Sequence, residues 1–210
     1  MGIEVEQHGG DGDGETPRPT ANIAFYYDFA SPESYLALER LAKSLAAFAP
    51  ELIPVRSAEL DPLPAPDDDA RRANIEEVAG RSDVLPLVWP AGFPDLDTAD
   101  AVRAATYAKS IGKVAVFSLS LFRQIYAGGA DPSSITTIYL AAAASEIHPR
   151  AIDQALSRDR VGQQADAATE AARGAGVTSV PALRIGQRLL VGPALLQDAA
   201  AVMRQALQGG

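Results

Sequence analysis

The chain has 210 residues and a formal net charge of −9, and a surface this acidic, without clustered lysine and arginine, argues against a nucleic-acid partner. Its hydrophobic fraction of 47% and charged fraction of 21% are ordinary for a globular domain with a sizeable core. The sequence contains no cysteine, and its two histidines, His8 and His148, have no second ligand at metal-binding spacing, so we expect neither a disulfide nor a metal site.

Residues 1–20 are rich in acidic side chains and glycine and poor in apolar ones, which predicts a disordered leader. They lack the basic patch and apolar stretch of a signal peptide. No apolar run approaches the roughly 20 residues that span a bilayer. We therefore expect a cytoplasmic protein that has no membrane partner.

The first regular elements meet at the motif Ser31-Pro32-Glu33-Ser34. Residues 23–29 are apolar and β-rich, which predicts a buried strand, and apolar residues recur at helical spacing over residues 35–48. Ser31 fits the N-cap of that helix and Pro32 its first position. Capping is the simpler role for Ser31. A hydroxyl there also lies at the positive end of the helix dipole, where a bound thiolate would be stabilised.

A second strand is predicted at residues 52–57, and the order strand, helix, strand predicts a parallel pair. The Asp- and Pro-rich segment 61–69 then breaks regular structure and ends in acidic residues suited to a helix start. The apolar loop Leu85–Pro94 carries the only tryptophan, and it is interpreted as a packed connection or as the wall of a binding site. Further helices are predicted at Asp97–Ile111, Val114–Tyr126, Ser133–Ser145 and Arg160–Arg173.

The chain returns to strands near its end. Residues 182–185 and 188–191 predict a β-hairpin, whose two-residue turn begins with Gly186 as a type II′ turn requires. An amphipathic helix is expected at residues 193–207.

This order of elements resembles an α/β thioredoxin fold interrupted by an α-helical insertion domain. Residues 21–60 and 177–210 would form the thioredoxin-like domain and residues 61–176 the insertion. The segment Tyr27–Ala37 is similar to the opening of 2-hydroxychromene-2-carboxylate isomerases and kappa-class glutathione transferases, within the DsbA-like superfamily. The resemblance covers about residues 23–207 and implies a homodimer and a cis Val180–Pro181 bond.

The resemblance also implies a site for glutathione or another low-molecular-weight thiol. Ser31 would be the catalytic residue, whose hydroxyl holds the bound sulfur as a thiolate. Val180 and Pro181 would offer backbone groups to the tripeptide. Ser34, one turn after Ser31 on the same side of the helix, is a further cofactor contact, with a buried hydroxyl bonded to backbone as its alternative role.

Three aromatic residues are candidates for contacting a small-molecule substrate. Trp89 and Phe93 would wall an aromatic substrate from their loop. Tyr35 would reach it from the first helix, with core packing as the alternative role.

Two family features are missing, namely the Asn-containing, Lys-bearing pattern in the loop after the second strand and a motif after the hairpin. After the hairpin these enzymes tend to carry Gly-Ser-Asp-Arg, whose serine and aspartate grip the γ-glutamyl end, whereas residues 192–195 here are Gly-Pro-Ala-Leu.

Three functions fit these observations. The first is a thiol-dependent cis-trans isomerase of an aromatic-derived enone acid. The second is a kappa-type glutathione transferase, and the third is a non-catalytic thioredoxin-fold binding module. A disulfide oxidoreductase does not fit, because thiol–disulfide exchange requires a thiolate and the chain contains no cysteine.

Overall fold

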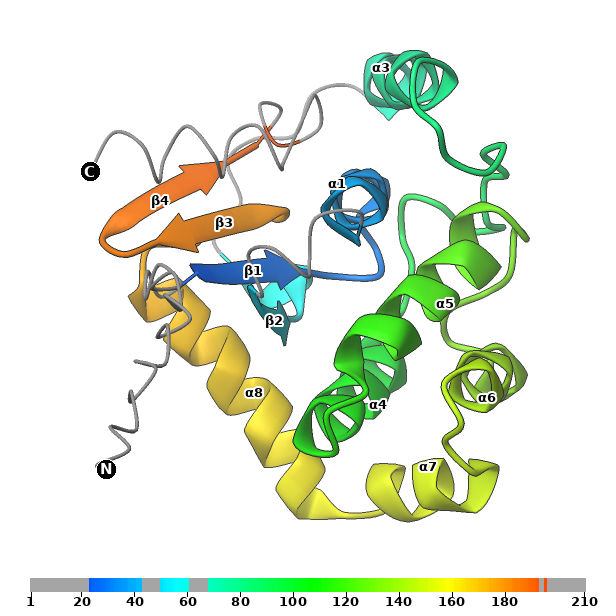
Figure 1. Cartoon of the computed structure of the whole chain (residues 1–210), viewed down its shortest axis with the longest axis vertical. Helices are drawn as coiled ribbons and strands as arrows, with labels where there is room; N and C mark the ends of the chain where they lie inside the picture. The colour runs from blue at the N-terminus through cyan, green and yellow to red at the C-terminus, as the bar shows by residue number, and fades with distance from the viewer. Residues whose placement is uncertain (1–22, 43–49, 61–67, 193–194, 196–210) are drawn as a thin grey trace, which may run out of the picture.

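A four-stranded mixed sheet forms the centre of the protein (Figure 1). The structure is a computed structural model that describes residues 23–42, 50–60, 68–192 and 195. The strands are β1 (Ile23–Tyr27), β2 (Glu51–Pro54), β3 (Ala182–Ile185) and β4 (Arg188–Val191), in the order β2-β1-β3-β4. β1 pairs parallel with β2 and antiparallel with β3, which confirms the predicted parallel pair.

β1 is buried on both faces, which explains its unbroken apolar sequence. Because side chains alternate along a strand, Phe25 and Tyr27 join one core cluster, whereas Ala24 and Tyr26 join a second. The first cluster also contains apolar residues of helices on one side of the sheet, and the second includes Ala172 near the end of the last described helix. The core therefore has two layers with β1 between them.

Two helices pack together on the first face of the sheet. They are α1 (Pro32–Ala42) and α5 (Val114–Tyr126), and α1 has the predicted amphipathic pattern. Buried Tyr27 shares a hydrogen bond of 2.6 Å with Ser118 of α5. Arg123 of α5 donates two hydrogen bonds, of 2.6 and 2.9 Å, to the buried carboxylate of Glu39 on α1. These contacts fix the direction in which α1 leaves the sheet.

The remaining helices lie between β2 and β3 in the chain. They are α3 (Asp68–Gly80), α4 (Ala99–Ser110), α6 (Ile135–Ala144), α7 (Pro149–Leu156) and α8 (Asp159–Gly174), with the short 3-10 helix η1 (Ser57–Glu59) after β2. The four predicted helices after the Leu85–Pro94 loop are confirmed, with ends shifted by two residues or fewer. α3 lies beside α1, and α4 to α7 stack on one side of the sheet (Figure 1).

Two predictions at the level of single elements were wrong. The helix α7 was not predicted; it has 8 residues, and its cap is the side chain of His148, which accepts a hydrogen bond from the Arg150 N–H at 3.1 Å. The second strand was predicted to reach residue 57, but β2 ends at Pro54 because Ser57–Glu59 forms η1. The predicted leader over residues 1–20 and helix over residues 193–207 lie outside the described residues, Leu195 apart.

The hairpin at the end of the sheet is as predicted. Gly186 has φ +59° while Gln187 does not have a positive φ, as a type II′ turn requires. In the described part of the chain, no helix is both long and apolar enough to cross a membrane.

Candidate functional site

Ser31 caps α1 at the carboxyl end of β1. Its Oγ accepts a hydrogen bond of 3.0 Å from the Ser34 N–H, and its carbonyl accepts the first helical bond, from the Tyr35 N–H at 3.2 Å. The Ser31 N–H donates to the Asp28 carbonyl at 3.1 Å and closes the turn between strand and helix. Ser31 is buried, with 4% of its surface exposed. The hydroxyl is therefore fixed at the positive end of the α1 dipole.

Asp28 holds that turn against the rest of the protein. Its carboxylate is buried and accepts four hydrogen bonds, from the Ala30 N–H at 3.2 Å, from the Thr98 hydroxyl at 2.7 Å, and from both the N–H and hydroxyl of Ser57 at 2.6 Å. Thr98 precedes α4 and Ser57 begins η1. A single carboxylate thus connects three segments around the start of α1, and its full set of donors accounts for a buried charge.

The hydroxyl of Ser31 is part of a charged network. It donates a hydrogen bond of 3.0 Å to the Oε2 of Glu33. Arg71 of α3 holds the same carboxylate in a two-pronged ion pair, with Nε–Oε1 at 2.6 Å and Nη2–Oε2 at 2.7 Å. The hydrogen bond to Glu33 raises the pKa of the Arg71 guanidinium. The proton of Ser31 is therefore directed at a carboxylate of its own chain.

The predicted aromatic wall is docked on α3. The rings of Trp89 and Phe93 lie 4.7 Å apart, and the guanidinium of Arg72 stands 4.8 Å from the centre of each. Arg72 also donates to the Phe93 carbonyl at 2.9 Å, and the Trp89 indole N–H donates to Glu76 at 2.7 Å. Arg71 lies 5.5 Å from the Phe93 ring centre. Phe93 is buried, with 7% of the residue exposed, and two guanidinium groups lie over its ring.

The Val180–Pro181 bond is cis, as the resemblance implies, and so is the Phe93–Pro94 bond. Since Ala182 pairs with Tyr26, Pro181 lies beside the carboxyl end of β1, from which the chain runs to Ser31. Val180 is half-buried, and within the described residues its N–H and C=O have no backbone partner. The structure therefore gathers Ser31, Val180 and Pro181 at one end of the sheet.

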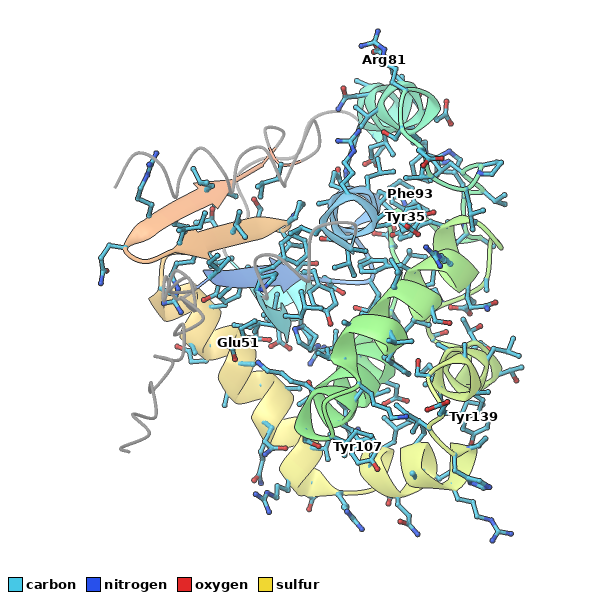
Figure 2. The ribbon with its side chains drawn as sticks, in the orientation of Figure 1. Tyr35, Glu51, Arg81, Phe93, Tyr107 and Tyr139 are labelled. Atoms are coloured by element: carbon cyan, nitrogen blue, oxygen red, sulfur yellow. The ribbon has the colours of Figure 1, made fainter. Side chains whose placement is uncertain are left out.

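Ser34 and Tyr35 are fully buried. The Ser34 Oγ has no hydrogen-bond partner within the described residues. Tyr35 lies between α1 and α5 (Figure 2), where its ring stacks on Tyr126 with centres 5.7 Å apart. Burial, together with the charge of Glu39, raises the pKa of Tyr35 to about 12. The structure places Tyr35 in the aromatic core, on the side of α1 that faces α5.

The charged residues of this site were not predicted from the sequence. Glu33 was visible only as the third residue of the Ser-Pro-Glu-Ser motif, and Arg71 and Arg72 only as a basic pair after a run of aspartates. The contact between Glu33 and Arg71 joins residues 38 positions apart.

A separate depression of about 580 Å³ lies between η1 and α8 and is lined by Glu59, Asp166, Ala167, Thr169, Glu170 and Arg173.

Comparison with known proteins agrees with the fold. Residues 22–204 match a family model described as a DSBA-like thioredoxin domain. A solved 2-hydroxychromene-2-carboxylate isomerase superposes with a TM-score of 0.75 at 22% identity, covering 89% of this chain and 97% of the other. No curated protein matches the chain by sequence.

Two other solved structures are similar. A probable DsbA oxidoreductase from Streptomyces coelicolor gives a TM-score of 0.65 at 18% identity, with 90% of this chain and 89% of the other covered. The cytosolic disulfide reductase DsbM from Pseudomonas aeruginosa, solved with GSH, gives a TM-score of 0.62 at 16% identity, with 89% of this chain and 98% of the other covered. At these identities the likeness establishes the fold.

Proposed function

The chain belongs to the DsbA-like thioredoxin domain family, and from this premise we propose that it is a thiol-dependent cis-trans isomerase of an aromatic-derived enone acid. The observation that carries the proposal is the Ser31 hydroxyl, fixed at the start of α1 at the same end of the sheet as the cis Pro181. Serine stands at both positions, 31 and 34, where a thiol enzyme of this fold carries cysteine. Disulfide exchange at this motif would require a thiolate, so a bound thiol fits the site better.

The residues present are suited to holding glutathione or a similar thiol. The half-buried Val180 has backbone groups that a peptide-like ligand can pair with, as an added strand would. The buried Ser34 hydroxyl, unpartnered within the described residues, is a further donor near the Ser31 end of α1. When bound, a thiol supplies a nucleophile that adds reversibly to a conjugated double bond and so allows rotation before it leaves.

The role of Ser31 in this proposal is to hold the sulfur in its anionic form. Its hydroxyl carries one proton, which it donates to Glu33 at 3.0 Å. To serve a sulfur, that proton has to turn away from Glu33. Together with the N-terminal N–H groups of α1, the hydrogen bond would then lower the thiol pKa. The Ser34 N–H keeps the oxygen in place meanwhile, because it bonds to a lone pair and not to the proton.

The proposal is tested by measuring thermal unfolding with reduced glutathione, cysteine and 2-mercaptoethanol, each compared with its S-methyl form. A ligand at 100 times its Kd should stabilise the protein by about 2.7 kcal/mol. We expect Ser31→Ala to abolish this thiol-dependent gain while costing only ~0.5–2 kcal/mol through loss of the α1 cap. Ser134→Ala is the matched control, since Ser134 precedes α6 and its side chain makes no cap bond.

Activity follows from the same variants. We expect thiol-dependent interconversion of 2-hydroxychromene-2-carboxylate and its ring-opened isomer, followed by absorbance, to fall by orders of magnitude in Ser31→Ala. Stable transfer of the thiol to an electrophilic aromatic chloride, without isomerisation, would indicate the kappa-type transferase instead. Absence of any thiol-dependent stabilisation at millimolar concentration would indicate a non-catalytic module.

A further inference from the structure

We propose that Arg71 is the binding site for a carboxylate of the ligand, and that Glu33 is an internal carboxylate which that ligand displaces. The inference rests on the proposed function, because it adds a second contact and a release step to the same site. Glu33 is held through both its oxygens by Arg71, with distances of 2.6 and 2.7 Å. This fork is the geometry in which arginine binds a free carboxylate, so Glu33 stands where a ligand's carboxylate would stand.

Arg71 is both accessible and held in place. Its side chain is 23% exposed and that of Glu33 16%, so neither is sealed from solvent. The Phe93 ring, 5.5 Å below the guanidinium, supports Arg71 independently of Glu33. The neighbouring Arg72 is committed elsewhere, since it lies against two rings and donates to the Phe93 carbonyl. Arg71 is therefore the cation that an incoming carboxylate can take over.

Displacement of Glu33 would also release Ser31. Ser31 donates its single hydroxyl proton to Glu33 in a hydrogen bond of 3.0 Å, and it cannot donate the same proton to a sulfur at the same time. When a ligand's carboxylate occupies Arg71, Glu33 loses its strongest partner and its charge can turn to solvent. Carboxylate binding at Arg71 and thiolate binding at Ser31 are thus coupled in the same direction.

The ligand class that follows is a small molecule with a carboxylate near its reacting atom. That carboxylate belongs either to the thiol or to the enone acid, and both present the same chemistry to Arg71. Arg72 already lies over the rings of Phe93 and Trp89, so the faces that it occupies are not free to stack on a neutral aromatic ring.

Calorimetric titration of the full chain separates the two sources. The first pair of probes is reduced glutathione and its diethyl ester, and the second is cinnamate and methyl cinnamate, with 2-mercaptoethanol present. We expect one acid to bind at least tenfold more tightly than its ester. A preference within the first pair assigns the carboxylate to the thiol, and a preference within the second assigns it to the substrate.

Three variants test the direction of the expected changes in acid binding. Glu33→Gln should tighten the favoured acid about fivefold, because Arg71 no longer has a competing anion. Arg71→Gln should abolish the preference for acid over ester. Arg81→Gln is the matched control and should leave it unchanged, since Arg81 follows α3 and projects into solvent at its outer end (Figure 2), with 77% of its side chain exposed.

If Arg71→Gln does not fold, the double variant Glu33→Gln/Arg71→Gln replaces it, because it removes both charges of the pair. Persistence of the preference without Arg71, or no tightening in Glu33→Gln, overturns the inference. Thiol binding that needs Ser31, with no acid-over-ester preference that needs Arg71 in either pair of probes, overturns only this inference. A carboxylate preference that needs Arg71, without any thiol effect, overturns only the proposed function. No binding of any probe to wild type or Glu33→Gln overturns both.

Discussion

Replacing Tyr35 by phenylalanine should make the protein more stable at neutral pH. Tyr35 is fully buried, and its hydroxyl has no hydrogen-bond partner within the described residues. The ring contacts with Tyr126 and Phe122 are kept by phenylalanine. An unpaired buried hydroxyl costs about 1–3 kcal/mol of desolvation, so removing it should raise the free energy of unfolding by ~1 kcal/mol.

Tyr126 provides the matched control. It stacks on Tyr35, is equally buried, and donates a hydrogen bond of 2.9 Å to the Phe29 carbonyl. Tyr126→Phe leaves that buried carbonyl unpaired and should lower the free energy of unfolding by about 1–2 kcal/mol. The same substitution at two tyrosines in contact should therefore change the free energy of unfolding in opposite directions.

The pH dependence supplies a second measurement on the same variant. The pKa of Tyr35 is raised to about 12 in the folded chain, mainly by burial. Tyr35 ionises near pH 10 in the unfolded chain and at higher pH in the folded chain. The part of the free energy of unfolding that depends on its protonation is therefore fully present below pH 10 and is lost as the pH rises toward 12. This group alone should remove about 2 kcal/mol by pH 12. Tyr35→Phe should reduce the loss by that amount.

Urea unfolding followed by far-UV circular dichroism at pH 7, and again between pH 10 and 12, measures both effects. A destabilised Tyr35→Phe protein would refute the reasoning, since it would mean that the hydroxyl makes a favourable contact. Loss of substrate binding in Tyr35→Phe with stability unchanged would instead place that hydroxyl in the ligand site.

Two further predictions concern the frame around the site. Asp28→Asn should destabilise the fold by about 3 kcal/mol in urea unfolding, because an amide cannot accept from all the donors of the carboxylate, the Ser57 N–H among them; a loss below ~1 kcal/mol would contradict this. Gly129→Ala should cost more than Gly112→Ala, because both glycines have positive φ but only at Gly129 would a Cβ meet another atom, 2.8 Å from Val88. We expect ~1 kcal/mol for the left-handed backbone at each position and a further ~1 kcal/mol for the contact; equal losses would exclude the contact.

The sequence predicted the elements whose signals are local. β1, α1 and the hairpin carry clear periodicity, a cap or a turn signal within a few residues, and these predictions were confirmed. α7 was missed because its 8 residues hold only two buried positions, Ile152 and Ala155, too few to show a period. Strand β2 was predicted too long because Val55, apolar, buried and still bonded to the Tyr27 carbonyl, follows the last strand residue, and the chain then turns into η1.

The charged contacts of the candidate site could not be predicted from local sequence signals. Ser31 was visible because its motif is contiguous, whereas the bonds of Glu33 with Arg71 and of Asp28 with Thr98 join different elements. Side-chain pairing across such distances depends on how α3 and α4 dock, which local propensity does not encode. Likewise the loop carrying Trp89 and Phe93 was recognised, but its partners on α3 were not.

The position of β3 in the chain has a consequence for biosynthesis. Tyr26 on β1 pairs with Ala182 on β3, so a ribosome adding 5–20 residues per second takes roughly 10–30 s to supply the partner after β1 has been made. Until then the edge of β1 that pairs with β3 lacks its partner strand, because β2 pairs with the opposite edge. Because Val180 and Pro181 arrive with β3, the two halves of the proposed thiol site meet only after β3 has been made. A chain stalled before residue 180 would carry Ser31 on its helix without the backbone that faces it.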